Sequence, residues 1–148
     1  MNAQIKQMNG LQLMRSMAKR EIPLPNIAEI IPMLDGTASR GEMTIRVRAD
    51  DRHLNSNEVI HGGFAATVLD TAMACAIHTM LNENSSVCTI DLNVKFLKSI
   101  PKGIDLFVEG KVNEITRNIG FASGILRDES GTVYVNASTS CMLLTNNL

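Results

Sequence analysis

The chain has 148 residues, of which 45% are hydrophobic and 20% are charged, and its formal net charge at pH 7 is −1. This length predicts one domain that buries a real core, and the near-neutral charge gives no basic footprint for nucleic acid. With no Trp, one Tyr and four Phe, the chain also has few aromatic side chains on which bases could stack.

The N-terminal part is predicted to hold one helix followed by a mostly extended stretch. Residues 9–20 place apolar side chains on one helical face and end in two basic residues, which favour a helix C-terminus. Three prolines keep most of the next stretch extended, although a short helix over 26–31, capped by Asn26, fits within it. We expect residues 1–34 to pack as a helical and extended segment on the rest of a single domain, 1–148. The first ten residues hold no apolar run of the signal-peptide type.

A turn, a strand and a loop are predicted next. Asp35-Gly36 is a turn signal, and residues 42–49 alternate between apolar and polar side chains, which predicts a strand with one buried face. Residues 50–60 are polar and without periodicity, so they are predicted to form a loop with His53 as a surface residue. This loop leads directly into a pair of glycines.

The most apolar run of the chain is Phe64–Leu81. Of its 18 residues, 13 are apolar and none is Pro or Gly, so the run predicts a helix. Apolar side chains would surround almost its whole circumference, leaving a narrow polar stripe of Thr67, Thr71 and His78, and such a helix is buried. Asp70 lies off that stripe among apolar neighbours, where a carboxylate needs a hydrogen-bond or charge partner or has a functional role. The Asp and His in the run, and the lack of flanking basic or aromatic anchors, argue against a membrane span.

Four strands are predicted after this helix. They lie at 87–97, about 104–115, 120–127 and 132–144, with a hairpin turn over 128–131. One face of the first of them is predicted to carry Cys88, Ile90, Leu92, Val94 and Phe96. The order of elements is an α+β pattern in which one antiparallel sheet packs on a buried central helix. Because a sheet covers one side of a helix only, we expect the N-terminal segment or a second subunit to cover the other side, and hence a dimer.

Cysteine and histidine spacing give no metal site. Cys75, Cys88 and Cys141 lack metal-ligand spacing, and their odd number predicts reduced core thiols in a cytoplasmic protein. The three His residues form no H-x-x-x-H pair with an acid, and no Walker A loop, dinucleotide fingerprint or Gly-x-Ser-x-Gly elbow is present.

The junction between the polar loop and the long helix is the first candidate site. Gly62 and Gly63 let another molecule approach the backbone closely. Free N–H groups at a helix N-terminus stabilise negative charge, whether on a phosphate or on the oxyanion of an attacked carbonyl. A tight turn into the helix explains the two glycines equally well. His61, just before them, is either an acid–base group or a turn or capping residue.

Asp70 is the second candidate, about two turns after the glycines. In one interpretation it is a general base or nucleophile whose pKa is raised by apolar surroundings. In the other it is a structural carboxylate bonded to a neighbouring Thr or backbone group. The residues alone leave both interpretations open. Cys75 is not expected to be a nucleophile, since it lies in an apolar helix with no adjacent His.

Asn55, the His61-Gly62-Gly63 run and Asp70, followed by a mostly apolar helix and the segment TIDLNVKFLKSI, resemble the hotdog-fold acyl-CoA thioesterases of the PaaI type. The similarity covers most of the chain, from GLQLM near the N-terminus to DESGTVYVNAS near the C-terminus. It implies the hotdog fold, in which an antiparallel sheet wraps around a long central helix. It also implies a homodimer or a dimer of dimers, with active sites at the dimer interface and no metal or organic cofactor.

The resemblance implies a role for each matching residue. Asp70 would activate water at the thioester carbonyl or attack it directly, and the Gly62 N–H would bind the thioester oxygen. Asn55, often presented by the other subunit, would position the water or the carbonyl. His61 would orient the loop and support the oxygen-binding site, and Thr89 would hold the attacking water.

Substrate-binding residues are implied as well. Gly63 belongs to the glycine pair that the substrate approaches, and Arg117 falls near a basic position often used for the CoA phosphates. Lys95 and Lys98 are further candidates for those phosphates. Family members often carry Gly-Arg-Arg/Lys-Thr where this chain has the sequence Thr-Arg-Asn-Ile over residues 116–119. Acyl-CoA and aryl-CoA substrates both remain open.

The sequence therefore predicts an acyl-CoA thioesterase that releases a carboxylic acid and CoA and has no nucleic-acid or membrane partner. Two alternatives remain. A hotdog enoyl-CoA hydratase or dehydratase shares the architecture, but such enzymes usually pair a His with an acid in a different spacing. A non-catalytic acyl-CoA-binding module is the other alternative, and it would have no need of both Asn55 and Asp70.

Overall fold

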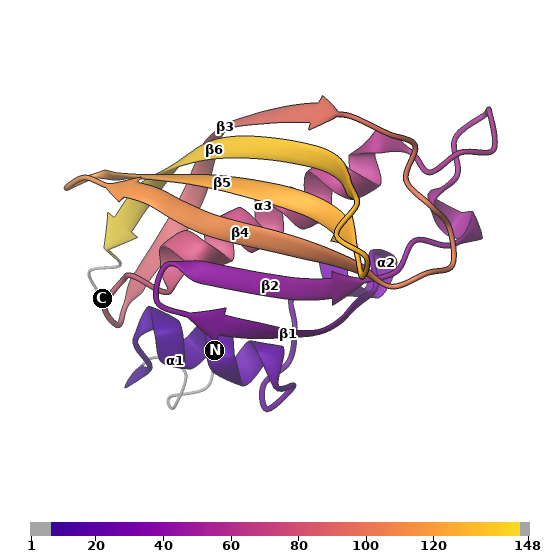
Figure 1. Cartoon of the computed structure of the whole chain (residues 1–148). Helices are drawn as coiled ribbons and strands as arrows, with labels where there is room; N and C mark the ends of the chain where they lie inside the picture. Colours follow the sequence, from indigo (N-terminus) through magenta and orange to yellow (C-terminus); the bar gives the residue numbers. More distant parts are fainter. Residues whose placement is uncertain (1–6, 146–148) are drawn as a thin grey trace.

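A single antiparallel sheet curls around one long helix in the computed structural model, which describes residues 7–145 (Figure 1). The helices are α1 (Gly10–Ala18), α2 (Ile27–Ile30) and α3 (Gly62–His78). The strands are β1 (Met33–Ser39), β2 (Glu42–Val47), β3 (Ser85–Phe96), β4 (Leu106–Ile115), β5 (Ile119–Asp128) and β6 (Val133–Thr145), in the sheet order β1-β2-β4-β5-β6-β3. This arrangement confirms the predicted α+β architecture, a sheet wrapped around a long central helix.

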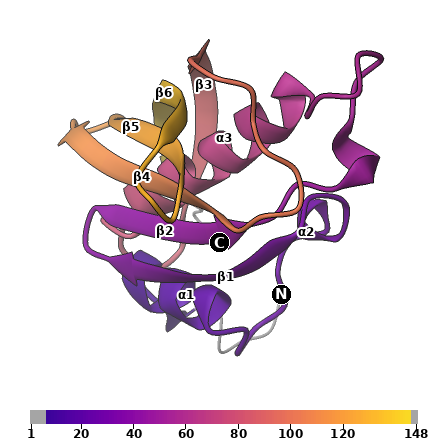
Figure 2. The ribbon, with the colours of Figure 1, turned by 45° about the vertical axis from the view of Figure 1, so that its right-hand side comes forward.

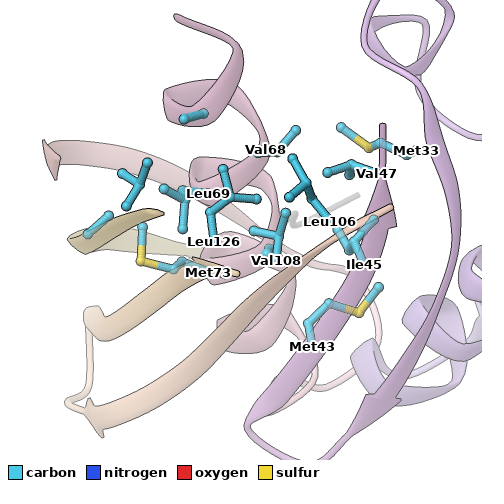
Figure 3. Packing of buried hydrophobic residues seen from close by; sticks show 14 of the residues in the cluster. Met33, Met43, Ile45, Val47, Val68, Leu69, Met73, Leu106, Val108 and Leu126 are labelled. Carbon is cyan, nitrogen blue, oxygen red and sulfur yellow. The ribbon is translucent and has the colours of Figure 1, made fainter. Parts of the chain in front are cut away.

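The helix α3 forms the axis of the core. It begins at the glycine pair and ends at His78, three residues earlier than predicted. One face is buried against apolar side chains of β2, β4 and β5 (Figure 3). This face comprises Phe64, Ala65, Val68, Leu69, Ala72, Met73, Ala76 and Ile77. Full burial of a large apolar side chain stabilises the fold by about 1.5–3 kcal/mol, so packing on the sheet holds α3 in place. No helix within residues 7–145 is long and apolar enough to span a membrane.

The opposite face of α3 is only partly covered. A stripe of partly exposed side chains runs along it, comprising Ala66, Thr67, Asp70, Thr71, Ala74, Cys75 and His78. The start of α1 packs against the end of this stripe, where Gly10 lies on the backbone of His78. The N-terminal segment also lies across a cavity from Thr71 and Cys75, and the rest of the stripe stays partly exposed. Within one chain the helix is therefore not buried all round, and the covering second subunit stays a prediction.

The turn predicted at Asp35-Gly36 is wrong, because β1 runs through both residues. They pair with β2 in an antiparallel ladder, and the chain reverses at Arg40-Gly41 instead. A side chain on Gly36 would collide with the carbonyl oxygen of Thr44, so the glycine permits close strand pairing rather than a turn. The short helix α2 follows Asn26 as predicted, but the Asn26 side chain makes no capping hydrogen bond.

The four strands after α3 lie within two residues of their predicted bounds. The hairpin turn between β5 and β6 is organised by Asp128, which accepts hydrogen bonds from the Ser130 hydroxyl at 2.7 Å and the Tyr134 hydroxyl at 2.7 Å. These two bonds lower the pKa of the Asp128 carboxyl to about 2. The predicted hairpin turn is confirmed.

The face predicted for β3 is wrong in its first half, because the strand contains a β-bulge. Thr89 pairs with Cys141 and Asp91 pairs with Ser140, so Ile90 is an extra residue in the ladder. A bulge of this kind shifts the alternation of side chains by one residue. Before the bulge Val87 packs on the core, and after it Leu92 and Val94 do so. Cys88 and Ile90, predicted on the same face as Leu92, are instead exposed.

The two edges of the sheet differ. The β1 edge lies over α1 (Figure 2), and Arg15 of that helix donates to the carbonyl of Ala38 at 3.1 Å. Arg20, just after α1, donates to the carbonyl of Leu34 at 2.9 Å. The β3 edge has no strand beside it among residues 7–145. A free edge strand of 12 residues is a template for pairing with another chain.

Candidate active site

His61 caps the N-terminus of α3. Its backbone is extended (φ −63°, ψ 137°), and its ring nitrogen Nδ1 accepts a hydrogen bond from the Gly63 N–H at 2.8 Å. Its own N–H donates to the carbonyl of His53 at 2.7 Å. These two bonds fix the direction in which the loop enters the helix. Of the two interpretations left open by the sequence, the geometry supports the capping residue.

Gly62 is the first residue of α3 and carries an unused donor. Among residues 7–145, no oxygen or ring nitrogen accepts its N–H, as expected in the first turn of a helix. The ring of Phe96, at the end of β3, lies so close that a Cβ on Gly62 would sit 2.8 Å from it. A side chain at this position would need the Phe96 ring to move aside. Because the N–H lies at the positive end of the dipole of a 17-residue helix, the position suits an anion or a developing oxyanion.

Asp70 lies two turns further along α3, half-buried on the open stripe. Its Oδ1 accepts a hydrogen bond from the hydroxyl of Thr89 on β3 at 2.8 Å. The bulge at Ile90 explains this contact, because regular alternation would turn Thr89 outward together with Asp91. The hydroxyl orients the carboxylate, and Oδ2 has no hydrogen-bond partner within residues 7–145. The sequence does not show this orientation, since nothing in the local pattern marks the bulge.

The thiols near Asp70 are not arranged for nucleophilic attack. Burial, and to a lesser extent the charge of Asp70, raise the pKa of the Cys75 thiol to about 12, so the thiol stays protonated near neutral pH. Cys141 is buried, with its Sγ 3.9 Å from Thr89 Oγ1. Cys88 is exposed on the outer face of the sheet, so the prediction of three core thiols is wrong for this residue. No group of three His, Cys, Asp or Glu side chains within the described part of the chain could hold a metal ion.

Asn55 is not brought to Asp70 within one chain. Its Oδ1 accepts hydrogen bonds from the N–H groups of Asn57 at 2.9 Å and Val59 at 3.3 Å. It thus braces its own loop, which extends away from the sheet before α3 (Figures 1 and 2). No hydrogen bond joins Asn55 to Asp70 among residues 7–145. No hydrogen bond within this loop uses the side-chain amide nitrogen of Asn55.

The predicted basic residues lie at two ends of the molecule. Lys98 lines an open groove beside the glycine junction, together with Gly62 and Phe96. Lys95 is exposed near the same end of β3, but it lies between the inward-facing Val94 and Phe96, so its side chain is on the outer face of the sheet. Arg117 is exposed in the turn between β4 and β5, which lies at the opposite end of the sheet from the start of α3 (Figure 1). A single chain therefore does not gather all three around one ligand.

His53 is a residue whose place the sequence does not reveal. Predicted as a surface residue, it is only 8% exposed, and its position in a 3₁₀ turn over Asp51–His53 explains the difference. Its Nδ1 accepts the Asp50 N–H at 3.0 Å, and its Nε2 lies 3.0 Å from the carbonyl oxygen of Ile30. Its ring packs 4.9 Å from that of Phe64 in the first turn of α3. His53 thereby ties α2 to the start of the helix that carries Gly62. Its partner on α2 is 23 residues away, so no local pattern could show this role.

The region from the loop before α3 to β6 matches a known family. The model of the thioesterase superfamily aligns with residues 57–135. A candidate esterase of Halobacterium salinarum is 36% identical over 90 residues, which cover 57% of this chain and 58% of that protein. A mitochondrial protein of Candida albicans is 25% identical over 124 residues, which cover 81% of this chain and 55% of that protein. The chain thus spans less than two thirds of the length of these curated relatives.

Solved structures match the fold over most of the chain. A candidate thioesterase of Ralstonia eutropha, related to phenylacetic acid degradation, has a TM-score of 0.78 at 25% identity and covers 87% of this chain and 98% of its own. The PaaI protein of Escherichia coli has a TM-score of 0.76 at 16% identity, covering 88% and 91%. A Streptococcus mutans protein solved with bound acetyl-CoA has a TM-score of 0.71 at 17% identity, covering 86% and 97%. The last two similarities show the fold alone.

The family match covers just over half of the chain, and it includes the glycine junction, Asp70 and Thr89. The sheet wrapped around α3 is the hotdog architecture of the solved relatives. The chain belongs to the thioesterase superfamily and has the hotdog fold of its PaaI-type members.

Proposed function

We propose that this protein hydrolyses acyl-CoA thioesters to a carboxylic acid and free CoA. The observation that carries the proposal is the half-buried Asp70 carboxylate, held at 2.8 Å by the Thr89 hydroxyl on the open stripe of α3. The free N–H of Gly62 supplies the second element of acyl-transfer chemistry. The structural relative that binds acetyl-CoA supports CoA thioesters as the substrate class.

The chemistry needs only a base and an oxyanion donor. Asp70 activates water for attack on the thioester carbonyl, or attacks it directly, while the Thr89 hydroxyl keeps the carboxylate in one orientation. The Gly62 N–H then stabilises the oxyanion of the tetrahedral intermediate, and one such donor lowers the barrier by about 2.7–4 kcal/mol. The CoA thiolate is a good leaving group, so neither a strong general acid nor a metal is required.

Gly62 and Asp70 of the same chain cannot serve one thioester. They are eight residues apart, about 12 Å along the helix axis. The N–H groups of a first turn point along that axis away from the helix body, so an oxygen bound to Gly62 would lie still further from Asp70. Reacting groups must approach within about 3–3.5 Å of each other. A complete site therefore needs Asp70 from one subunit and Gly62 from another.

A two-fold dimer supplies this combination. If the symmetry axis passes the open stripe midway between Gly62 and Asp70, the two α3 helices lie side by side in opposite directions and form two equal sites. Asn55, in the loop before Gly62, then enters the site from the same subunit as Gly62. The open β3 edge lies beside the same region, whereas the β1 edge is covered by α1. This difference favours association through the β3 side.

The same dimer unites the basic residues. Opposed helices bring the end of one subunit that carries Arg117 to the end of the other that carries Gly62 and Lys98. We assign the CoA phosphates to Arg117 of the subunit that donates Asp70 and to Lys98 of the subunit that donates Gly62. Lys95 lies near the same end of the sheet, on its outer face. A dimer thus resolves the separation seen within one chain.

The assignment is tested with Asp70→Asn, which keeps the shape of the side chain and removes its charge. General-base catalysis contributes about 10²–10⁴-fold, so thiol release from acyl-CoA should fall by at least about 100-fold. The matched control is Asp91→Asn, since Asp91 also accepts a hydroxyl hydrogen bond, from Ser140, but on the outer face of β3. Turnover by Asp70→Asn close to that of the control would refute the assignment. Hydration of an enoyl-CoA without thiol release would point to the lyase alternative.

A further inference from the structure

An apolar cavity of about 70 Å³ lies between the N-terminal segment and α3, on the open side of the molecule. Methionines of α1, β1 and β2 form much of its wall, and Met33 and Met43 are visible at this margin of the core (Figure 3). Its lining includes Met17, Ala18, Leu24, Met33, Met43 and Cys75. The catalytic scheme above leaves this cavity unused.

The cavity offers no partner to a polar ligand. Two charged residues reach its margin, but both are engaged elsewhere. Arg20 donates to the carbonyls of Met33 and Leu34, and the Asp35 carboxylate is paired with Arg46. Since a buried polar group without a partner is costly, the cavity selects a purely apolar ligand.

An apolar path leads from Asp70 to the cavity across α3. Thr71 and Cys75, which line the cavity, lie about 100° and 140° around the helix from Asp70. Thr71 donates its hydroxyl to the Thr67 carbonyl, and Thr67 donates its own to the Gly63 carbonyl. Both hydroxyl protons are thus used within the helix, and neither threonine has a free donor to offer a ligand on this path. The two threonines are therefore less polar toward such a ligand than the sequence indicates.

Length and volume define the ligand. At a helix radius of about 5–6 Å, an arc of 100° is about 10 Å long. An extended chain advances about 1.2 Å per bond, so about eight bonds separate the reacting carbonyl from the cavity. The cavity has about half the volume of one that holds benzene, about 150 Å³, so it admits the end of a flexible chain but not an aromatic ring. Methionine walls adapt readily to such a chain.

We propose that this cavity binds the methyl end of an unbranched, medium-length aliphatic acyl chain of about 8–12 carbons, rather than an aryl group. The proposal rests on the proposed thioesterase function for its catalytic readout and for the position of the reacting carbonyl at Asp70, from which the chain length is counted. Burial of each further methylene should raise kcat/KM about fourfold once the chain reaches the cavity, until the cavity is full.

The test changes the volume of the cavity in both directions. Ala18→Met places three further heavy atoms into the cavity, and Met17→Ala removes three from its wall. The control is Lys19→Met, which places the same side chain at the neighbouring, exposed position outside the cavity. For each variant, kcat/KM is measured across acyl-CoA chains from butanoyl to tetradecanoyl and for benzoyl-CoA and phenylacetyl-CoA. Affinity is measured by calorimetry for S-alkyl-CoA thioethers of the same lengths, which no thioesterase can cleave.

The expected result is a preference for chains of about 8–12 carbons over butanoyl and aryl groups. Ala18→Met should lower the decanoyl-to-butanoyl ratio of kcat/KM by about 50-fold, Met17→Ala should shift the preference to longer chains, and Lys19→Met should leave it unchanged. The thioethers should show the same ordering in affinity. If Ala18→Met and Lys19→Met share one length profile, or if aryl groups are preferred, the proposal is overturned. Length-dependent thioether binding without any thiol release would refute the proposed hydrolysis while supporting the cavity.

Discussion

Replacing Gly62 by Pro removes the proposed oxyanion donor and little else. Proline is well tolerated at the first position of a helix, where its missing N–H has no intrahelical partner. The residue before a proline must be extended, and His61 already is, at φ −63° and ψ 137°. The new ring would press on Phe96, which is 55% exposed and can turn aside. The fold should therefore accept the change.

The magnitude follows from the loss of one charge-stabilising donor. Such a loss costs about 2.7–4 kcal/mol of transition-state stabilisation, which is about 10²–10³-fold in kcat. The matched control is Gly62→Ala, which makes the same contact with Phe96 but keeps the N–H. We expect Gly62→Ala to lose about tenfold or less, so the two variants should differ by at least about tenfold in kcat.

The assay is thiol release from an acyl-CoA under single-turnover conditions, which isolates the chemical step from product release. Thermal unfolding of each variant tests whether the fold survives the change. If Gly62→Pro and Gly62→Ala have the same single-turnover rate, the Gly62 N–H does not bind the oxyanion.

Thr89, His53 and the cysteines give three further tests of the contacts at and around the site. Thr89→Val removes the hydrogen bond to the Asp70 carboxylate and should lower kcat about 10–100-fold with little change in KM, whereas Thr89→Ser should recover most of it, as measured by steady-state thiol release. His53→Phe keeps the packing on Phe64 but removes the two partly buried hydrogen bonds of the ring, to the Asp50 N–H and to the Ile30 carbonyl. Urea unfolding should show a loss of about 2 kcal/mol, and an unchanged unfolding free energy would contradict the contacts described. At pH 8, iodoacetamide should modify the exposed Cys88 but not Cys75, whose pKa of about 12 keeps its thiol protonated; peptide mass spectrometry distinguishes the two.

The sequence predicts the elements that local periodicity encodes. The apolar run of α3 and the alternating strand β2 both lie close to where their patterns place them. The strand β1 is not predicted, because Asp35-Gly36 resembles a turn. The segment forms a strand because it pairs with β2, not because of the pattern of its own residues. The bulge at Ile90 is not predicted for a related reason, since its position depends on the pairing of β3 with β6.

The same distinction holds for the site. The spacing between the glycine junction and Asp70 can be read from the sequence, and the resemblance to a family assigns both a role in catalysis. The orientation of Thr89 toward Asp70 requires the bulge, which local alternation contradicts. The contact of His53 with Ile30 joins residues far apart in the chain, and periodicity carries no information about it. That Gly62 and Asp70 lie on one continuous helix, and so cannot meet within one chain, is established by the observed bounds of α3.

Complementation between two inactive variants tests directly whether each site is shared between two subunits. Asp70→Asn and Gly62→Pro chains are co-expressed with different tags, and the heterodimer is purified through both tags. If sites are shared, one site of the heterodimer combines the intact Asp70 of one chain with the intact Gly62 of the other. The second site then carries both substitutions. A shared site predicts that the heterodimer recovers about half of the wild-type thiol-release activity, although each homodimer is at least about 100-fold impaired. A heterodimer as inactive as its parents would mean that Gly62 and Asp70 of different subunits do not form one site.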